Sequence, residues 1–118
     1  MFEIGIDLVD LETLNQKRTE VLINRLLSDE EKIIYNDITD KTRQLTFLGG
    51  RFSAKEALFK AFKQGDKTAN YRDFTVLNDE VGAPYFVDNH FLSGYTIKLS
   101  ITHTKHYASA VVLLIKNK

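Results

Sequence analysis

The sequence contains no cysteine, has no net charge and includes no long apolar run. Without cysteine the chain has no disulfide and no thiol for catalysis, which suits a cytoplasmic protein. Because sixteen basic residues balance sixteen acidic ones, bulk electrostatic binding to nucleic acid or to an anionic membrane is disfavoured. No apolar run approaches the length of a membrane span. The N-terminus also lacks the basic region and apolar run of a signal peptide, so we expect none.

The length and the order of the periodic segments predict one domain of the α+β class. The 118 residues fit a single domain over 1–118, with no repeat or linker. Apolar patterns predict a strand, then helices, then strands, at residues 1–9 (strand), 10–27, 29–35 and 40–64 (helices), and 74–77, 84–87, 96–102 and 107–115 (strands). Short turns between the later strands predict an antiparallel meander. We therefore expect an antiparallel sheet packed against a long helix and shorter helices.

Local signals mark the ends of the helices and an unusual site within the longest one. The segment Ser28-Asp29-Glu30-Glu31 is a capping box. Gly65 is placed as the C-terminal stop of the long helix. Inside that helix, Gly49-Gly50 predicts either a bend or a close approach of another part of the chain to the backbone.

One face of the long helix carries Phe52, Glu56 and Lys60, which are spaced i, i+4 and i+8. The carboxylate and the ammonium can form a helix pair worth about 0.2–0.5 kcal/mol. They can also serve chemistry, with Glu56 holding a hard cation and Lys60 neutralising an anion. The helix alone leaves both interpretations open.

Asp7 interrupts the first apolar strand. A buried acid costs free energy unless it is paired or binds a metal. Asp7 could instead cap the next helix, but Asp10 already fills the cap position. The sequence therefore favours a functional role for Asp7.

Three patterns occur together in this short chain: Gly5-Ile6-Asp7-Leu8-Val9-Asp10, Arg51-Phe52-Ser53-Ala54-Lys55-Glu56-Ala57-Leu58-Phe59-Lys60-Ala61 and Ser100-Ile101-Thr102-His103-Thr104. Gly82-Ala83-Pro84 adds a Gly-x-Pro before a strand. Over nearly the whole chain they resemble the 4'-phosphopantetheinyl transferase family, and the length matches its small trimeric type. The resemblance implies transfer of the phosphopantetheine arm of coenzyme A to a serine of acyl carrier protein, in fatty acid biosynthesis.

The resemblance also implies a role for individual residues. Asp7 and Glu56 match the family's Mg²⁺ ligands, and Lys60 matches the lysine that faces the diphosphate or the attacking hydroxyl. His103 matches a contact to a phosphate of coenzyme A. Positions that line the family's nucleotide site are matched by Arg51, Gly65, Pro84 and Thr104. Because larger members hold two such halves in one chain, a homotrimer with sites at the subunit interfaces is implied.

The chemistry of that reaction independently requires these residue types. Attack on a diphosphate requires neutralisation of its charge, which Mg²⁺ on one or two carboxylates can supply together with Lys60. Either Glu56 or a water on the metal could take the serine proton. The residue pattern leaves both bases open.

The stretch expected to dock the carrier protein departs from the family. The family commonly has an arginine early in its first helix, whereas this chain has Leu11-Glu12-Thr13-Leu14. Acyl carrier proteins are acidic, so docking is expected to rest on the basic side chains Lys17, Arg18 and Arg25.

Two other functions fit the residue pattern. A metal-dependent phosphodiesterase or nuclease could use Asp7 and Glu56 with Asp10 as a further acid, although zero net charge disfavours a nucleic-acid substrate. A non-enzymatic protein-binding module would use Glu56 and Lys60 only as a helix pair and Asp7 only as a cap.

Overall fold

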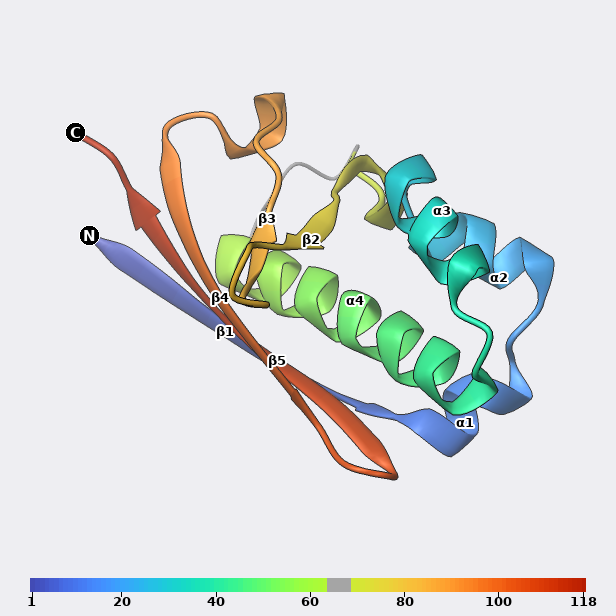
Figure 1. Ribbon diagram of the computed structural model, residues 1–118. Helices are drawn as coiled ribbons and strands as arrows, with labels where there is room; N and C mark the ends of the chain where they lie inside the picture. The colour runs from blue at the N-terminus through green and yellow to red at the C-terminus, as the bar shows by residue number, and fades with distance from the viewer. Residues whose placement is uncertain (64–68) are drawn as a thin grey trace.

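A computed structural model describes residues 1–63 and 69–118 of the chain. A three-stranded sheet lies along one long helix, and shorter helices gather beside that helix's N-terminal half (Figure 1). The elements are β1 (Phe2–Asp10), α1 (Leu11–Gln16), α2 (Glu20–Leu26), α3 (Asp29–Asp37), α4 (Lys41–Phe62), η1 (Tyr71–Asp73), β2 (Val76–Asn78), β3 (Pro84–Phe86), η2 (His90–Leu92), β4 (Tyr95–His103) and β5 (Tyr107–Lys116), where η marks a 3₁₀ turn. The predicted α+β class is confirmed.

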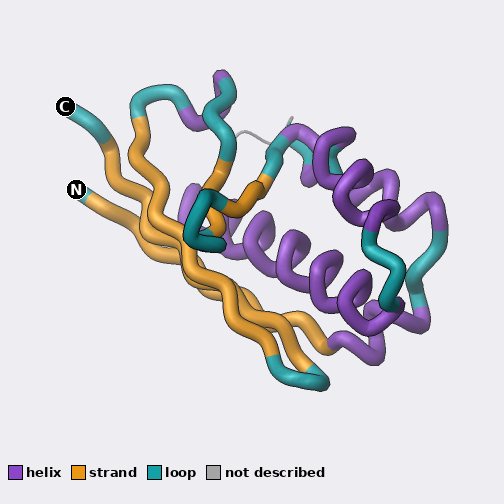
Figure 2. Tube along the Cα trace, in the orientation of Figure 1, coloured by secondary structure: helices purple, strands orange, loops and turns teal. Residues whose placement is uncertain are grey.

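The main sheet has β5 at its centre, paired antiparallel with β1 on one side and with β4 on the other. β2 and β3 form a separate two-stranded antiparallel sheet. The predicted single meander is therefore wrong, because the chain leaves β3 through η2 before β4 begins (Figure 2). Only β4 and β5 form a hairpin within the main sheet.

The predicted helix over 10–27 is in fact two helices. α1 ends at Gln16, and α2 begins only at Glu20. Thr19 starts the second helix, since its hydroxyl oxygen accepts a hydrogen bond from the backbone N–H of Leu22 at 3.2 Å. Such a cap competes with helix continuation. The break turns the chain so that both short helices can pack against α4.

The long helix α4 begins where Asp40 caps it, with the carboxylate accepting from Arg43 N–H at 3.0 Å. It ends at Phe62, two residues before the predicted end. The predicted stop, Gly65, lies outside the described residues. Although α4 has 22 residues, none of the described helices is long and apolar enough to cross a membrane.

The glycine pair inside α4 marks a close approach. A Cβ on Gly49 would lie 2.4 Å from the Leu11 side chain, and one on Gly50 would lie 3.4 Å from that of Ile101. Elements at both ends of the chain therefore press on this turn of the helix. The sequence predicted either a bend or a close approach at this glycine pair, and the structure supports the close approach.

Another glycine brings a strand against the same helix. A Cβ on Gly5 of β1 would lie 1.9 Å from the backbone oxygen of Ala57. Only glycine allows such contact between two backbones. The contact places the residues that follow Gly5 in β1 beside the middle turns of α4.

Two apolar clusters pack against α4, one at each end of the helix. One packs the C-terminal half of the helix against the sheet and the β2–β3 hairpin, and its fully buried members include Leu58, Phe74, Val76 and Val112. The other packs the N-terminal half against the short helices, with Leu11, Leu27 and Leu48 at its centre. The buried side chains of α4 thus hold the sheet and the short helices together.

A buried ion pair lies within this framework. The Lys55 ammonium and the Glu31 carboxylate, 2.5 Å apart, are both wholly buried. Lys55 also donates to the backbone oxygen of Leu26 at 2.8 Å. Burial lowers the pKa of Lys55, and the Glu31 carboxylate opposes that shift.

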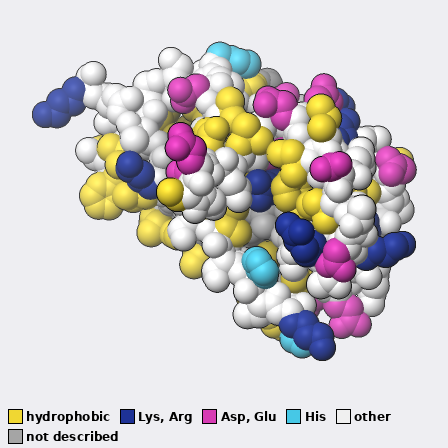
Figure 3. All heavy atoms as spheres, in the orientation of Figure 1, with side chains coloured by type: hydrophobic (Ala, Val, Ile, Leu, Met, Phe, Trp, Pro, Cys, Tyr) yellow, Lys and Arg dark blue, Asp and Glu magenta, His cyan; other side chains and the backbone are white. Residues whose placement is uncertain are grey.

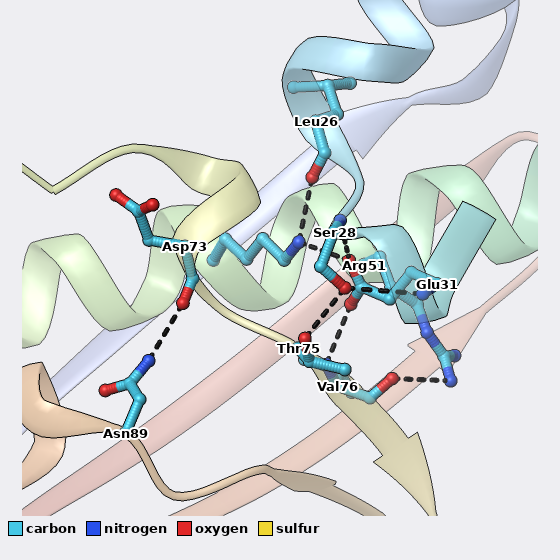
Figure 4. Close-up of polar contacts among 9 residues, drawn as sticks. Leu26, Ser28, Glu31, Arg51, Asp73, Thr75, Val76 and Asn89 are labelled. Carbon is cyan, nitrogen blue, oxygen red and sulfur yellow. Dashed lines mark hydrogen bonds and ion pairs between the residues drawn. The ribbon is translucent and has the colours of Figure 1, made fainter. Parts of the chain in front are cut away.

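Glu31 also links α3 to β2, as Figure 4 shows. One carboxylate oxygen accepts from Ser28 N–H at 2.9 Å and completes the predicted capping box. The other accepts from Val76 N–H at 2.8 Å. Beside it the Thr75 hydroxyl donates to the Ser28 hydroxyl at 2.7 Å. The capping box is confirmed, and it extends into a polar network that fixes the start of β2.

Candidate active site

The strand β1 and the helix α4 bring three carboxylates to one cavity, among them Asp7 and Glu56. This cavity of about 280 Å³ opens beside the first short helix. Its lining residues are Asp7, Leu8, Val9, Asp10, Thr13, Leu14, Lys17, Phe52 and Glu56. The two acids that the sequence singled out are therefore neighbours, although they lie far apart in the chain.

Asp7 is paired with Lys60 across the strand–helix contact. The Lys60 ammonium lies 2.9 Å from Asp7 Oδ1 and donates to the backbone oxygen of Ile6 at 3.0 Å. The Asp7 side chain is only 15% exposed. Lys60 thus pairs with the strand and not with Glu56 on its own helix. Asp7 is not a helix cap, because that role belongs to Asp10, which accepts from Thr13 N–H at 3.1 Å.

Glu56 is held by a tyrosine that the sequence analysis did not single out. The Tyr71 hydroxyl donates to Glu56 Oε1 at 2.6 Å. Burial, followed by the hydrogen bond and the charge of Glu56, raises the pKa of Tyr71 to about 12. The hydroxyl therefore stays protonated near neutral pH and acts as a donor. No local pattern marks this residue, because its partner lies fifteen positions earlier in the chain.

The donor set at this cavity fits Mg²⁺. Across the described ranges, no group of three or more His, Cys, Asp or Glu side chains is arranged to hold a metal ion. Mg²⁺ needs no such cage, since it keeps several waters and takes one or two carboxylates plus substrate phosphate. Asp7 and Glu56 meet that requirement. Asp10 is occupied as a cap, which argues against the many-carboxylate site of a two-metal phosphodiesterase.

A second cavity, of about 340 Å³, is lined by basic side chains. The space-filling view shows a hollow in this face, with Lys or Arg side chains and a histidine around it (Figure 3). Its lining residues are Ile38, Arg43, Thr46, Phe47, Gly50, Arg51, Asn78, Gly82, Pro84, Ile101 and His103. No carboxylate is among the described residues that line it. Arginine and histidine side chains in this arrangement favour an anion such as a phosphate.

Arg51 forms the wall between this cavity and the core. Its guanidinium donates to the Val76 carbonyl at 3.2 Å and to the Asn78 side chain at 2.9 Å. It lies 4.1 Å from the centre of the Phe47 ring, a cation–π contact. Burial lowers the pKa of Arg51, against the opposing charge of Glu31. The guanidinium is therefore fixed in place beside the cavity.

Of the other predicted nucleotide-site residues, those that the structure describes lie at the basic cavity or in the β4–β5 turn. Pro84 and His103 line the basic cavity with Arg51. The Thr104 side-chain oxygen accepts from the N–H groups of His106 and Tyr107, so it shapes the β4–β5 turn. Gly65 lies outside the described residues. The two cavities share no lining residue in the part of the chain that the structure describes, so Asp7 and Glu56 lie in one cavity and Arg43, Arg51 and His103 in another.

The three basic residues expected to dock a carrier do not share one helix. Lys17 ends α1 and lines the acid cavity. Arg18 lies between the helices and donates to the Tyr35 hydroxyl at 3.3 Å. Arg25 is exposed on α2 and lines another cavity, together with Arg72. Because the predicted helix over 10–27 is two helices, the three side chains do not form one helical face, and Arg18 is partly used within the fold.

An α+β fold with two carboxylates and a lysine at one cavity, and basic side chains at another, has the parts that transfer of a phosphate ester requires. The chain belongs to the 4'-phosphopantetheinyl transferase superfamily, whose family model matches residues 3–112.

Curated relatives and solved structures agree with this assignment. The holo-[acyl-carrier-protein] synthase of Acholeplasma laidlawii is 50% identical over 111 residues, which cover 94% of this chain and 93% of that protein. The holo-[acyl-carrier-protein] synthase of Onion yellows phytoplasma is 44% identical over 121 residues, which cover 98% of this chain and 95% of that protein. A crystal structure of the Bacillus anthracis synthase in complex with CoA (3',5'-ADP) superposes with a TM-score of 0.88 at 30% identity. That superposition covers 98% of this chain and 96% of the other.

Proposed function

We propose that this chain is a holo-[acyl-carrier-protein] synthase, which transfers the 4'-phosphopantetheine group of coenzyme A to a serine of acyl carrier protein. Adenosine 3',5'-bisphosphate is released, and the product serves fatty acid biosynthesis in the cytoplasm. The observation that carries the proposal is the 50% identity to the Acholeplasma laidlawii synthase over 94% of the chain. The shared cavity of Asp7 and Glu56, beside Lys60, supplies the matching chemistry.

In the reaction, the serine oxygen attacks the phosphorus on the pantetheine side of the diphosphate and forms a new P–O bond. The bond from that phosphorus to the bridging oxygen breaks, and adenosine 3',5'-bisphosphate leaves with the electron pair. The serine proton passes to Glu56 or to a water. The Lys60 ammonium lies 2.9 Å from Asp7 Oδ1. At this position its charge can stabilise the diphosphate oxygens that become more negative during transfer.

Asp7 and Glu56 would hold Mg²⁺, which when bound neutralises the diphosphate and polarises its phosphorus. Lys60 supplies a positive charge beside Asp7. For both Asp7 and Glu56 to bind one cation, their carboxylates also have to lie close together. The contact of Gly5 with the backbone of α4 serves that purpose.

His103, Arg51 and Pro84 would bind the nucleotide end of coenzyme A at the basic cavity, with Thr104 in the adjoining turn and Gly65 as a further candidate. Arg43 lines the same cavity and adds a cation that the sequence analysis did not select. Together these groups offer the positive charge that a phosphate requires.

We also propose a homotrimer with sites at the subunit interfaces, which an exposed apolar face and the two distinct cavities support. On the outer side of β1, four apolar side chains are 62–68% exposed, namely Phe2, Ile4, Ile6 and Leu8. The register places Val111, Leu113 and Ile115 of β5 beside them. A contiguous apolar face of this kind marks an interface. A second copy packed there would cover it and bring another chain's basic cavity toward the acids.

Mixing two inactive variants should restore activity if each site draws on two chains. A Glu56→Gln chain lacks the acid, and a His103→Ala chain lacks the phosphate contact, but a mixed trimer contains sites with both residues intact. We expect each variant alone to be nearly inactive and the refolded mixture to regain transfer. Analytical ultracentrifugation provides the control, and an active monomer at the assay concentration would contradict shared sites.

Reversing two exposed charges should weaken capture of the carrier protein. Lys17→Glu together with Arg25→Glu should raise the KM for acyl carrier protein roughly tenfold at low salt and flatten its dependence on ionic strength over a Debye length of about 8–10 Å. The KM for coenzyme A should stay unchanged. The matched control is Lys116→Glu with Lys118→Glu, which makes the same change of charge at the C-terminus. A rise in the KM for coenzyme A alone would place the docking surface elsewhere.

The function itself is tested with purified protein, Mg²⁺, coenzyme A and unmodified acyl carrier protein. Intact mass spectrometry should show the carrier gaining the mass of one phosphopantetheine group, and a chelator should stop the reaction until Mg²⁺ is added back. An unmodified carrier under all these conditions would refute the proposal.

A further inference from the structure

We propose that Tyr71 is a positioning residue, whose hydroxyl holds one oxygen of Glu56 and leaves the other free for the cation of the transfer site. The proposal rests on the proposed function and names a residue of this chain that sets the geometry of its metal ligand. It starts from the 2.6 Å hydrogen bond between the Tyr71 hydroxyl and Glu56 Oε1. Within residues 1–63 and 69–118, Glu56 Oε2 accepts no hydrogen bond from protein.

The ring of Tyr71 is held by two aromatic side chains that flank Glu56 on α4. It meets Phe52 edge to face at 5.5 Å between ring centres and lies 5.3 Å from Phe59. Phe52 stands four residues before Glu56 and Phe59 three residues after it, so all three lie on one face of the helix. The hydroxyl is thus directed at the carboxylate by packing on both sides.

A role in packing alone would not require the hydroxyl. Phenylalanine would fill the same aromatic cluster, and the hydroxyl of a half-buried tyrosine could bond to water. Here it bonds instead to Glu56, one of the three acids that line the cavity. Groups that orient a metal-binding carboxylate typically change metal affinity or activity by about 10–100-fold when removed. Loss of this hydrogen bond is therefore expected to weaken cation binding, apart from any effect on folding.

The test compares Tyr71→Phe with wild-type chain and with Tyr95→Phe. Tyr95 also packs its ring edge to face, against Phe62 at 5.3 Å, and lines a different cavity. We expect Tyr71→Phe to bind Mn²⁺ about tenfold more weakly, both alone and with coenzyme A, as measured by electron paramagnetic resonance. Its kcat for transfer should fall by a similar factor, whereas its KM for carrier protein and its melting temperature should stay within error. Tyr95→Phe should match wild type in every measurement.

The readouts separate this proposal from the function on which it rests. If wild type makes no modified carrier yet binds Mn²⁺ about tenfold more tightly than Tyr71→Phe, the function fails and the positioning role stands. If wild type transfers the group and Tyr71→Phe equals it in Mn²⁺ affinity and kcat, the positioning role is overturned. A variant Tyr71→Leu adds the packing comparison: the same Mn²⁺ affinity in Tyr71→Phe as in wild type, with a loss only in Tyr71→Leu, would also overturn it.

Discussion

Replacing Glu56 with glutamine should reduce the rate of phosphopantetheine transfer on the order of 10²–10³-fold. The amide keeps the size of the side chain and can still accept the hydrogen bond from Tyr71. It removes the negative charge that would hold Mg²⁺ and the group that could take the serine proton. The rate is measured by intact mass spectrometry of the carrier at saturating coenzyme A and Mg²⁺. Asp7→Asn should act in the same direction and also loosen Lys60, whose ion pair it removes.

The matched control for this prediction is Glu30→Gln, the same change at an exposed carboxylate on α3. That variant should keep the wild-type rate. Circular dichroism and the melting temperature should show that Glu56→Gln remains folded. A Glu56→Gln chain that transfers at more than half the wild-type rate would contradict both the metal role and the base role of this residue.

Replacing Lys55 with methionine should destabilise the fold by about 3–5 kcal/mol, because it leaves the Glu31 charge buried without its partner. Both side chains are wholly buried, so water cannot replace the ammonium. The Leu26 carbonyl also loses its donor. Urea denaturation measures the free energy of unfolding, and the melting temperature should fall by about 10–20 °C.

An exposed ion pair gives the comparison. Lys32 lies 3.3 Å from Asp29, whose side chain is 84% exposed. Lys32→Met is the same substitution in a partly exposed pair, in which the Lys32 side chain is 23% exposed, and it should cost less than about 1 kcal/mol. If Lys55→Met and Lys32→Met cost the same, burial is not what makes the Lys55 pair important.

The helical part of the fold shows what local sequence can and cannot predict. Ser28 and Glu31 form the predicted capping box, because such a cap depends on residues three apart. The same Glu31 also binds Val76, 45 residues further along the chain, and no local pattern contains that contact. The break after Gln16 was missed, although Thr19 followed by Glu20 carries the signal of a second helix start.

For the strands and the site as well, local patterns predicted some features and missed those that depend on tertiary contacts. Each strand was located by its apolar pattern, but the split into two sheets depends on which strands pair, and pairing is set by tertiary contacts. The family motifs led to Asp7, Glu56 and Lys60, and the structure brings them together around one strand–helix contact. Tyr71 was missed because it approaches Glu56 only through its packing on Phe52 and Phe59.

The contact of Gly5 with Ala57 sets how closely the main chains of β1 and α4 approach, while Lys60 and Tyr71 hold the carboxylates of Asp7 and Glu56. A side chain at position 5 would therefore move the strand and the helix that carry both acids apart, whereas loss of Lys60 or Tyr71 would release only one carboxylate. For protein engineering, a transfer of this pair of acids would have to carry the nine-residue strand and the 22-residue helix together. A graft onto another α+β scaffold would need to preserve the glycine at the crossing point before any of the surrounding hydrophobic residues.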